Sequence, residues 1–273
     1  MIQLSPADYE RIRRLAHNSF GLDLKDGKEA LVAARISKRI RELHLSGVRE
    51  YLERLERDPS GEALRELVDD LTTHFTSFLR EKEHFDLLQN RILVEWPPPQ
   101  HLRIWSAGCS TGEEPYSIIF SILDHEPSLD RVELYATDIS RPVLETAAGG
   151  VYDEDRLRDM PPGWIPRFFQ KGCGRWAGSC RVKKDLRSRI RFERRNLIES
   201  LDGLPLFHVI FCRNLMIYFN RETQERLVRQ FAAHLEPGGY LFIGHSEGLM
   251  AINHALEFVK AAIYRKPGKP QKR

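Results

Sequence analysis

The stretch IWSAGCSTGEEPYS, Ile104 to Ser117, decides the fold class of this chain. Its apolar start predicts a buried strand, the small residues from Ala107 to Gly112 predict a turn, and Pro115 belongs to the first turn of a following helix. A buried strand that passes through a glycine-rich turn into a helix predicts a βαβ unit, and therefore a parallel sheet. The small residues also let a ligand approach the backbone where the strand ends.

The same strand pattern recurs along the chain. Each recurrence is a short apolar run bounded by turn residues, with a helical pattern before the next run. The expected strands are HLRIWSAG (101–108), RVELYATD (131–138), PLFHVIFC (205–212) and GYLFIGHS (239–246), and the expected helices begin near Pro115, Ser140 and Arg221. The EPGG segment (236–239) is expected to be a turn before the last strand. This alternation predicts an α/β fold with a mostly parallel sheet covered on both faces.

Residues 150–195 interrupt the alternation. They contain two adjacent prolines and several glycines, followed by the alternating segments CRVKKDL (180–186) and SRIRFERR (188–195). Alternation of apolar and polar residues over so few positions predicts short, half-buried strands. We therefore expect a small antiparallel β-subdomain, inserted in the α/β domain at about 150–195.

Residues 1–71 predict a small all-α domain, followed by the α/β domain at 72–273. Ser5 can cap a helix that begins at Pro6 and ends at Gly21. A second helix has apolar residues at helical spacing, with basic residues pointing away from that stripe. The apolar residues are Val32, Ile36, Ile40 and Leu43, and the basic ones are Arg35, Lys38, Arg39 and Arg41.

Composition excludes several classes of protein. Hydrophobic residues make up 41% of the 273 residues and charged residues 30%, which is typical of a globular protein, and a net charge of +3 is too small to indicate a nucleic-acid binder. No apolar run approaches the roughly 20 residues that span a bilayer, and no signal peptide is present, so we expect a cytoplasmic protein. Cys173 and Cys180 could pair or hold a metal, but no CxxC motif or nearby histidine accompanies them, and no metal site is expected.

Acidic residues around the glycine-rich turn indicate what ligand it takes. Glu113 and Glu114 would repel a phosphate at this helix N-terminus, whereas a ligand with a cationic centre, such as S-adenosylmethionine, fits. Asp138 ends the second expected strand, where an acid can accept hydrogen bonds from ribose hydroxyls. The alternatives are that the glutamates only stabilise the helix N-terminus and that Asp138 caps the helix at Ser140.

Two further segments carry polar residues beside buried ones. The fourth expected strand runs into Arg213, Asn214 and Tyr218, at the mouth of the sheet. Before the first strand, Thr76 and Arg80 are interleaved with apolar residues, and Arg80 could oppose a carboxylate. The alternatives are a surface cation at Arg213, a core tyrosine at Tyr218 and an ordinary helix end around Arg80.

Five ordered motifs together resemble the CheR family of chemoreceptor methyltransferases. They are TTHFTSFLREKEHF (72–85), AGCSTGEEPYS (107–117), ATDIS (136–140), FCRNLMIYF (211–219) and LEPGGYLFIGHSE (235–247), and the basic stretch RISKRIREL (35–43) resembles the family's N-terminal domain. The resemblance implies a class I S-adenosylmethionine methyltransferase-like fold with an N-terminal helical domain that docks on the receptor, and an inserted β-subdomain.

The resemblance also implies the site. The implied cofactor contacts are His74, Thr76, Arg80, Glu114, Asp138, Asn196, Leu197, Arg213 and Asn214. Arg80 and Tyr218 match the residues nearest the transferred methyl group, and are the implied catalytic residues. The chain departs from the family in having His74 in place of an asparagine and Leu79 in place of a second phenylalanine. A charge on His74 below about pH 6.5 would oppose a sulfonium.

The implied reaction is methylation of glutamate side chains on the cytoplasmic domain of a chemoreceptor, giving methyl esters and S-adenosylhomocysteine. A glutamate carboxylate, with a pKa near 4.3, is ionised at neutral pH and needs no general base. No membrane insertion or nucleic-acid partner is implied, and docking of a receptor C-terminal peptide on the β-subdomain is left open. The alternatives are a cofactor-binding signalling module without activity, an NAD-dependent oxidoreductase, for which GxGxxG is missing, and a nucleic-acid methyltransferase, for which an NPPY-like motif is missing.

Overall fold

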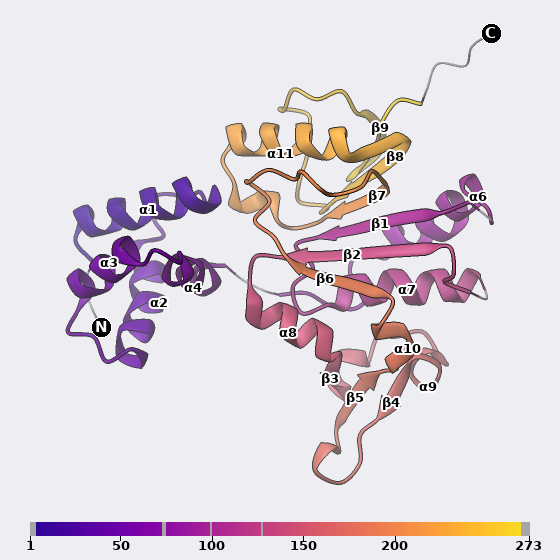
Figure 1. The fold of residues 1–273 in the computed structure, drawn as a ribbon, viewed down its shortest axis with the longest axis horizontal. Helices are drawn as coiled ribbons and strands as arrows, with labels where there is room; N and C mark the ends of the chain where they lie inside the picture. The colour runs from indigo at the N-terminus through magenta and orange to yellow at the C-terminus, as the bar shows by residue number, and fades with distance from the viewer. Residues whose placement is uncertain (1–3, 73–74, 99, 127, 269–273) are drawn as a thin grey trace.

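Helices alone make up the N-terminal part of the computed structural model, which describes residues 4–72, 75–98, 100–126 and 128–268 (Figure 1). The helices are α1 (Pro6–Phe20), α2 (Glu29–Glu42), α3 (Val48–Arg57) and α4 (Glu62–Leu71). Helix α1 begins with the expected capping box, since the Ser5 hydroxyl accepts from the N–H of Asp8 at 3.1 Å, and it ends at Gly21 with φ of +70°. The inner faces of the four helices form a hydrophobic core of their own.

The main sheet of the described residues has seven strands in the order β6-β2-β1-β7-β8-β10-β9. Their bounds are β1 (Leu102–Ala107), β2 (Val132–Asp138), β6 (Ile190–Arg194), β7 (Phe207–Cys212), β8 (Leu235–Ile243), β9 (Glu257–Lys260) and β10 (Ile263–Arg265). Neighbouring strands pair in parallel from β6 through β2, β1 and β7 to β8, and β10 and β9 add an antiparallel edge. The mostly parallel sheet is therefore confirmed.

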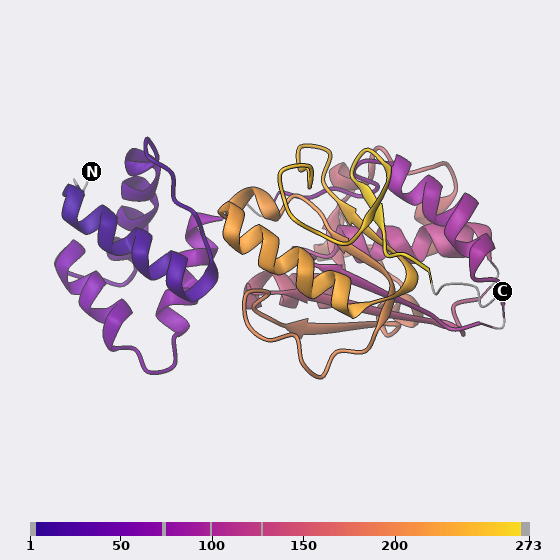
Figure 2. The ribbon, with the colours of Figure 1, turned by 90° about the horizontal axis from the view of Figure 1, so that it is seen from above.

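Alternating side chains of the central strands pack into two hydrophobic cores, one on each face of the sheet. In β1, Ile104 packs in the core on one face of the sheet and Trp105 in the core on the other. The first face is covered by α5 (Glu83–Leu87), the π-helix η1 (Leu88–Ile92), α6 (Leu93–Glu95), α7 (Glu113–His125) and α8 (Arg141–Gly149), and the second by α11 (Arg221–His234). Figure 2 shows α11 lying along the sheet beside the N-terminal helices. This layering leaves the carboxyl ends of β1 and β2 directed at the N-terminal helices (Figure 1).

A three-stranded antiparallel sheet, ordered β3-β5-β4, projects from the main sheet domain (Figure 1). Its elements are β3 (Val151–Asp153), η2 (Glu154–Leu157), α9 (Trp164–Phe168), β4 (Phe169–Lys171), η3 (Gly174–Trp176), β5 (Ser179–Val182) and α10 (Lys184–Arg187). An inserted antiparallel β-sheet was expected here, and it is present. Cys180 lies in β5 and Cys173 in the loop between β4 and η3, and both are free cysteines.

Two local predictions were wrong. The segment SRIRFERR was assigned to the inserted sheet, but Ile190–Arg194 is β6, the edge strand of the main sheet, paired in parallel with β2. A strand that is covered on one face alternates in the same way in either sheet, so the pattern cannot distinguish them. The EPGG segment was expected to precede a strand, but it lies inside β8, where the pairing with β7 shifts register between Phe207 and Val209.

The basic face of α2 is smaller than the sequence indicates. Arg39 forms an ion pair with Asp70 at 2.7 Å, and Arg35 donates to the backbone carbonyls of Asp70 and Thr72. These two guanidiniums fasten α2 to the end of α4, and only Lys38 and Arg41 of the four basic residues are exposed. In the part of the chain that the structure describes, no helix is long and apolar enough to cross a membrane.

Candidate cofactor site at the carboxyl ends of the parallel strands

Two adjoining cavities, of about 90 and 60 Å³, lie where the parallel strands end. Gly108, Asp138 and Tyr218 line both of them, so the cavities form one continuous site. The first is also lined by Thr76, Arg80, Glu114, Arg213 and Asn214, and the second by Phe20, Leu22, Val68, Asn196 and Leu197. The N-terminal helices therefore supply one wall, and the ends of β1, β2 and β7 supply the others.

The N–H groups of Gly108, Cys109 and Ser110 in the glycine-rich turn already have hydrogen-bond partners. The N–H groups of Gly108 and Cys109 both donate to the carbonyl of Thr137, and the N–H of Ser110 donates to Asp138. A phosphate-binding loop presents such N–H groups to the ligand, and this turn directs them to β2 instead. These N–H groups are therefore not available to a phosphate, which agrees with the acidic sequence after the turn.

The two glutamates at the start of α7 have different roles. Glu114 lines the larger cavity, accepts from the Ser106 hydroxyl at 2.6 Å and forms an ion pair with Arg213 at 3.1 Å. Glu113 is fully buried, lines neither cavity and forms an ion pair with Arg156 of η2 at 2.6 Å. Burial raises the pKa of both carboxyl groups. Only Glu114 can contact a ligand, and Glu113 instead joins the main domain to the inserted sheet.

Asp138 holds the site together at the end of β2. One carboxylate oxygen accepts from the N–H of Ser110 at 2.9 Å, and the other accepts from the N–H of Ser140 at 3.0 Å. The carboxylate thus fixes both the glycine-rich turn and the start of α8, as the capping alternative requires. Each carboxylate oxygen can accept more than one hydrogen bond, and Asp138 also lines both cavities, so ribose binding and capping are compatible.

Arg213 lies in a buried charge network at the end of β7. Its side chain is 2% exposed and donates to Glu81 and Glu114, each at 3.1 Å, and also to the backbone carbonyl of Arg80. Burial tends to raise the pKa of Glu81, but the charge of Arg213 and hydrogen bonds from His245, Arg213 and Asn214 together lower it. The network ties the segment of Arg80 to the turn after β7, so Arg213 fixes the shape of the cavity as well as lining it.

The half-buried carboxylate of Glu247 fixes the turn that carries Tyr218. It accepts from the N–H groups of Asn214 at 2.9 Å, Gly244 at 2.6 Å and Ile217 at 3.2 Å, and burial raises its pKa. Asn214 has a φ of +57°, and a Cβ at Gly244 would approach the Asn214 side chain to 2.3 Å. The glycine is therefore required for the close approach of the two turns, which places η4 (Met216–Tyr218) at the cavity.

Arg80 and Tyr218 reach the larger cavity from separate segments. The Arg80 guanidinium donates to the carbonyl of Phe75 at 3.1 Å and lies 6.0 Å from the centre of the Phe75 ring. Among the described residues, Arg80 forms no ion pair with a carboxylate, so its charge is available to a ligand. The backbone carbonyl of Tyr218 accepts from the N–H of Asp23 at 2.7 Å, which joins η4 to the N-terminal helices.

Asn196 and Leu197 lie on the loop after β6, in the wall of the smaller cavity. The Asn196 side chain donates to the carbonyl of Ser19 and to Glu199, both at 2.9 Å, and Leu197 is buried. Just before them, Arg194 forms an ion pair with Glu62 of α4 at 2.9 Å. The N-terminal helices are therefore attached to the sheet domain beside the site.

Nearly all of the predicted site residues meet at this one place. Those that line the cavities are Thr76, Arg80, Glu114, Asp138, Asn196, Leu197, Arg213, Asn214 and Tyr218. His74 lies outside the described residues. Sequence reasoning missed Glu81 and Glu247, although each belongs to a motif that it singled out, since Glu81 follows Arg80 and Glu247 ends GYLFIGHSE.

Comparisons with known proteins extend over both parts of the chain. The family described as "CheR methyltransferase, SAM binding domain" matches residues 74–265, and "CheR methyltransferase, all-alpha domain" matches residues 7–72. The chain is 40% identical to chemotaxis protein methyltransferase 2 of Pseudomonas aeruginosa, over 94% of this chain and 92% of that protein. It is 35% identical to the chemotaxis protein methyltransferase of Escherichia coli, over 96% of this chain and 92% of that protein. The chain therefore belongs to the CheR methyltransferase family, whose larger domain binds S-adenosylmethionine.

Proposed function

We propose that this protein transfers the methyl group of S-adenosylmethionine to glutamate side chains on the cytoplasmic domain of a chemoreceptor. The relatives named chemotaxis protein methyltransferase support a role in chemotaxis, and the residues of the site support methyl transfer from S-adenosylmethionine. The observation that carries the proposal is the cavity where Asp138 and Glu114 meet Arg80 and Tyr218, beside a turn whose amide donors are already used.

The residues of the cavity suit the cofactor. Asp138 would accept hydrogen bonds from the ribose hydroxyls, and Glu114 places a carboxylate beside the cationic amino acid part. Leu197 and the apolar side chains of the smaller cavity would contact the adenine ring. When bound, the cofactor supplies an electrophilic methyl group.

The chain's own contribution to the reaction is positioning. A substrate glutamate is ionised at neutral pH, so the protein has no proton to remove before the carboxylate attacks. Arg80, which has no ion pair within the described chain, would orient the incoming carboxylate, and the Tyr218 hydroxyl would align it from η4. Holding the two reactants together and excluding water can lower the barrier by several kcal/mol. A very strong ion pair would stabilise the ground state, so alignment is the better role for Arg80.

We also propose that the helices of residues 1–71 dock on the receptor. Lys38 and Arg41 are exposed on α2, and a charged contact of this kind would raise the rate of encounter with an acidic partner. The receptor's cytoplasmic domain would then present its glutamates to the cavity.

The test is incubation of the full chain with labelled S-adenosylmethionine and candidate receptor signalling domains, scored as base-labile methyl label. We expect label on glutamate, a loss of turnover of at least about 100-fold in Arg80→Ala, and a smaller loss in Tyr218→Phe, because only the former removes a charge. Arg158→Ala is the matched control, since that arginine is exposed and pairs with Asp155 outside the cavity. Cofactor binding without label on any receptor domain would favour the alternative of a signalling module without activity.

A further inference from the structure

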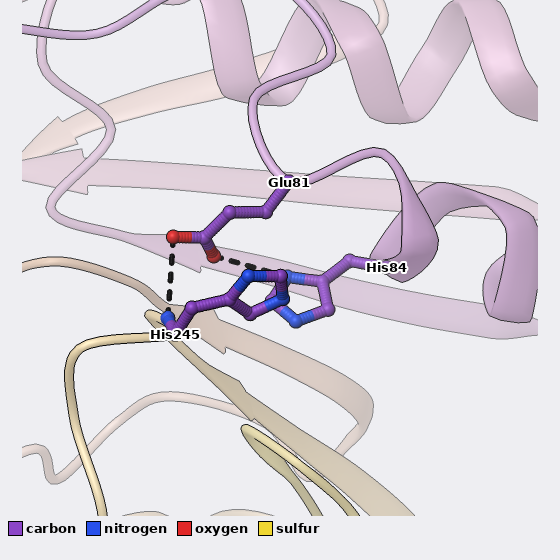
Figure 3. A group of neighbouring side chains, drawn as sticks. All are labelled: Glu81, His84 and His245. Atoms are coloured by element: carbon purple, nitrogen blue, oxygen red, sulfur yellow. Dashed lines mark hydrogen bonds and ion pairs between the residues drawn. The ribbon is translucent and has the colours of Figure 1, made fainter.

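Two histidines and a glutamate meet beside the Arg213 network, and neither histidine lines the two cavities. Ligand atoms of Glu81, His84 and His245 all lie within 4.8 Å of one another (Figure 3). The Nδ1 atom of His84 is 3.5 Å from Glu81, and the two imidazole rings are 5.1 Å apart between centres. Glu81 and His245 are 164 positions apart in the sequence, so only the fold creates this group.

His84 is the unusual member. Its side chain is fully buried, its ring packs edge-on against Phe242 at 5.2 Å, and neither ring nitrogen has a hydrogen-bond partner among the described residues. A buried imidazole with two unsatisfied nitrogens costs free energy, since each nitrogen has lost its contact with water. A buried imidazole nitrogen without a hydrogen-bond partner is a candidate metal ligand, because the metal would replace the contact with water that the nitrogen has lost.

The surrounding charges tolerate a cation. A fourth possible ligand, the carboxylate of Glu83, lies 4.0 Å from Nε2 of His245, and both side chains are exposed enough to admit an ion from solvent. Arg213 opposes a cation, as does Lys260 more weakly. The negative charges of the Glu81, Glu83 and Glu114 carboxylates offset these positive charges.

Arg213 need not leave Glu81 for a metal to bind. The guanidinium donates through Nε at 3.3 Å and Nη2 at 3.1 Å to one carboxylate oxygen of Glu81. The other oxygen accepts from the N–H of His245 at 3.2 Å and from the Asn214 amide at 3.4 Å, and a metal at this oxygen would replace the long bond from Asn214. A cation that donates hydrogen bonds to a metal-binding carboxylate orients it, as outer partners do in known metal sites.

We propose that Glu81, His84 and His245 form a binding site for a divalent transition metal, with Zn²⁺ as the best fit and Glu83 as the fourth ligand. Two imidazole nitrogens and carboxylate oxygens in a four-coordinate group are a zinc-type set, whereas Mg²⁺ and Ca²⁺ prefer oxygen ligands alone. The metal would satisfy the buried nitrogen of His84 and join the start of α5 to the turn after β8. It has no part in the methyl-transfer step.

The test is titration of the full chain with Co²⁺ alone, followed by visible absorption. A Cys173→Ser background removes the one exposed thiol among the described residues, so that thiolate binding does not contribute. We expect one Co²⁺ per chain with the intense absorption of a four-coordinate site, displaced by Zn²⁺, which binds more tightly. His245→Ala should weaken Co²⁺ binding by at least about tenfold, and Glu83→Gln by less. His101→Ala is the matched control, because His101 pairs with Glu133 at 3.7 Å in an exposed His–Glu pair outside the group.

His84→Ala should abolish the four-coordinate spectrum, with circular dichroism confirming that the variant is folded. Because His84 is buried, His245→Ala and Glu83→Gln keep the test decisive if that variant fails to fold. Absence of a four-coordinate spectrum in the parent chain, or a spectrum unchanged in His245→Ala, would overturn the proposal. A further consequence rests on the proposed function. Because Glu81 also forms an ion pair with Arg213, saturating Zn²⁺ should change the affinity for S-adenosylhomocysteine at least about twofold in the parent chain. The same Zn²⁺ concentration should leave this affinity unchanged in His245→Ala. The spectroscopic result does not depend on that function.

Discussion

The buried charge network around Arg213 leads to a quantitative prediction about stability. The Arg213 side chain is 2% exposed, and its carboxylate partners Glu81 and Glu114 are 13% and 12% exposed. Replacing either glutamate by glutamine leaves the guanidinium with one carboxylate. Each single substitution should therefore lower the free energy of unfolding by about 1.5–3 kcal/mol, the range for hydrogen bonds to a charged group.

Replacing both glutamates should have a disproportionate effect. The buried guanidinium of Arg213 would then have only neutral partners, and an uncompensated buried charge costs about 3–5 kcal/mol. We therefore expect the double variant Glu81→Gln/Glu114→Gln to lose about 1–3 kcal/mol more than the sum of the single variants. In an Arg213→Met background the same substitutions should be neutral or stabilising, because the two carboxylates then lack a buried cation and each glutamine removes an uncompensated charge.

Urea unfolding of the full chain, in buffer with EDTA so that no metal contributes, measures all of these free energies. The slope with denaturant concentration should be the same for each variant, which checks that the same surface is exposed on unfolding. Losses that add within about 0.5 kcal/mol would refute the reasoning, because they would mean that the two carboxylates do not share one buried cation.

Three further predictions concern separate parts of the molecule. Asp138→Ala should weaken binding of S-adenosylhomocysteine by about 1.5–3 kcal/mol in calorimetry, and unchanged affinity in a folded variant would remove Asp138 from the site. Reversing the charges of Lys38 and Arg41 should slow receptor methylation most at low salt, and equal rates at every ionic strength would mean that this face is only a solvated surface. Burial lowers the pKa of His208, so the unfolded chain binds more protons below pH 6.5 and stability falls on acidification. His208→Asn should therefore reduce the loss of unfolding free energy between pH 7 and pH 5, whereas the same loss as in the parent would contradict this assignment.

The sequence by itself determined the layers of the fold and the edge of the sheet at which polar residues gather. The strands that end at Ala107 and Cys212 have apolar residues on both faces, a pattern that is typical of a strand covered on both sides. Helix caps such as Ser5 can also be predicted, because they depend only on residues a few positions away. The carboxyl ends of parallel strands lie at one edge of the sheet, so Asp138 and Arg213 were expected at the same edge. These features follow from local physics and one rule of topology.

Only the tertiary structure decided which charged and polar groups form ion pairs or hydrogen bonds with one another, and which strand pairs with which. Alternation in SRIRFERR fits either sheet, and the choice of the main sheet depends on which neighbour offers an open edge to β6. The guanidiniums of Arg35 and Arg213 are indistinguishable from solvated cations until Asp70 and Glu81 are placed beside them. The pairing of His84 with His245 likewise comes from segments that are distant in the chain. Charge and hydrogen-bond partners across such separations are set by packing, because long side chains and buried polar atoms take whatever partner the completed fold brings within about 3 Å.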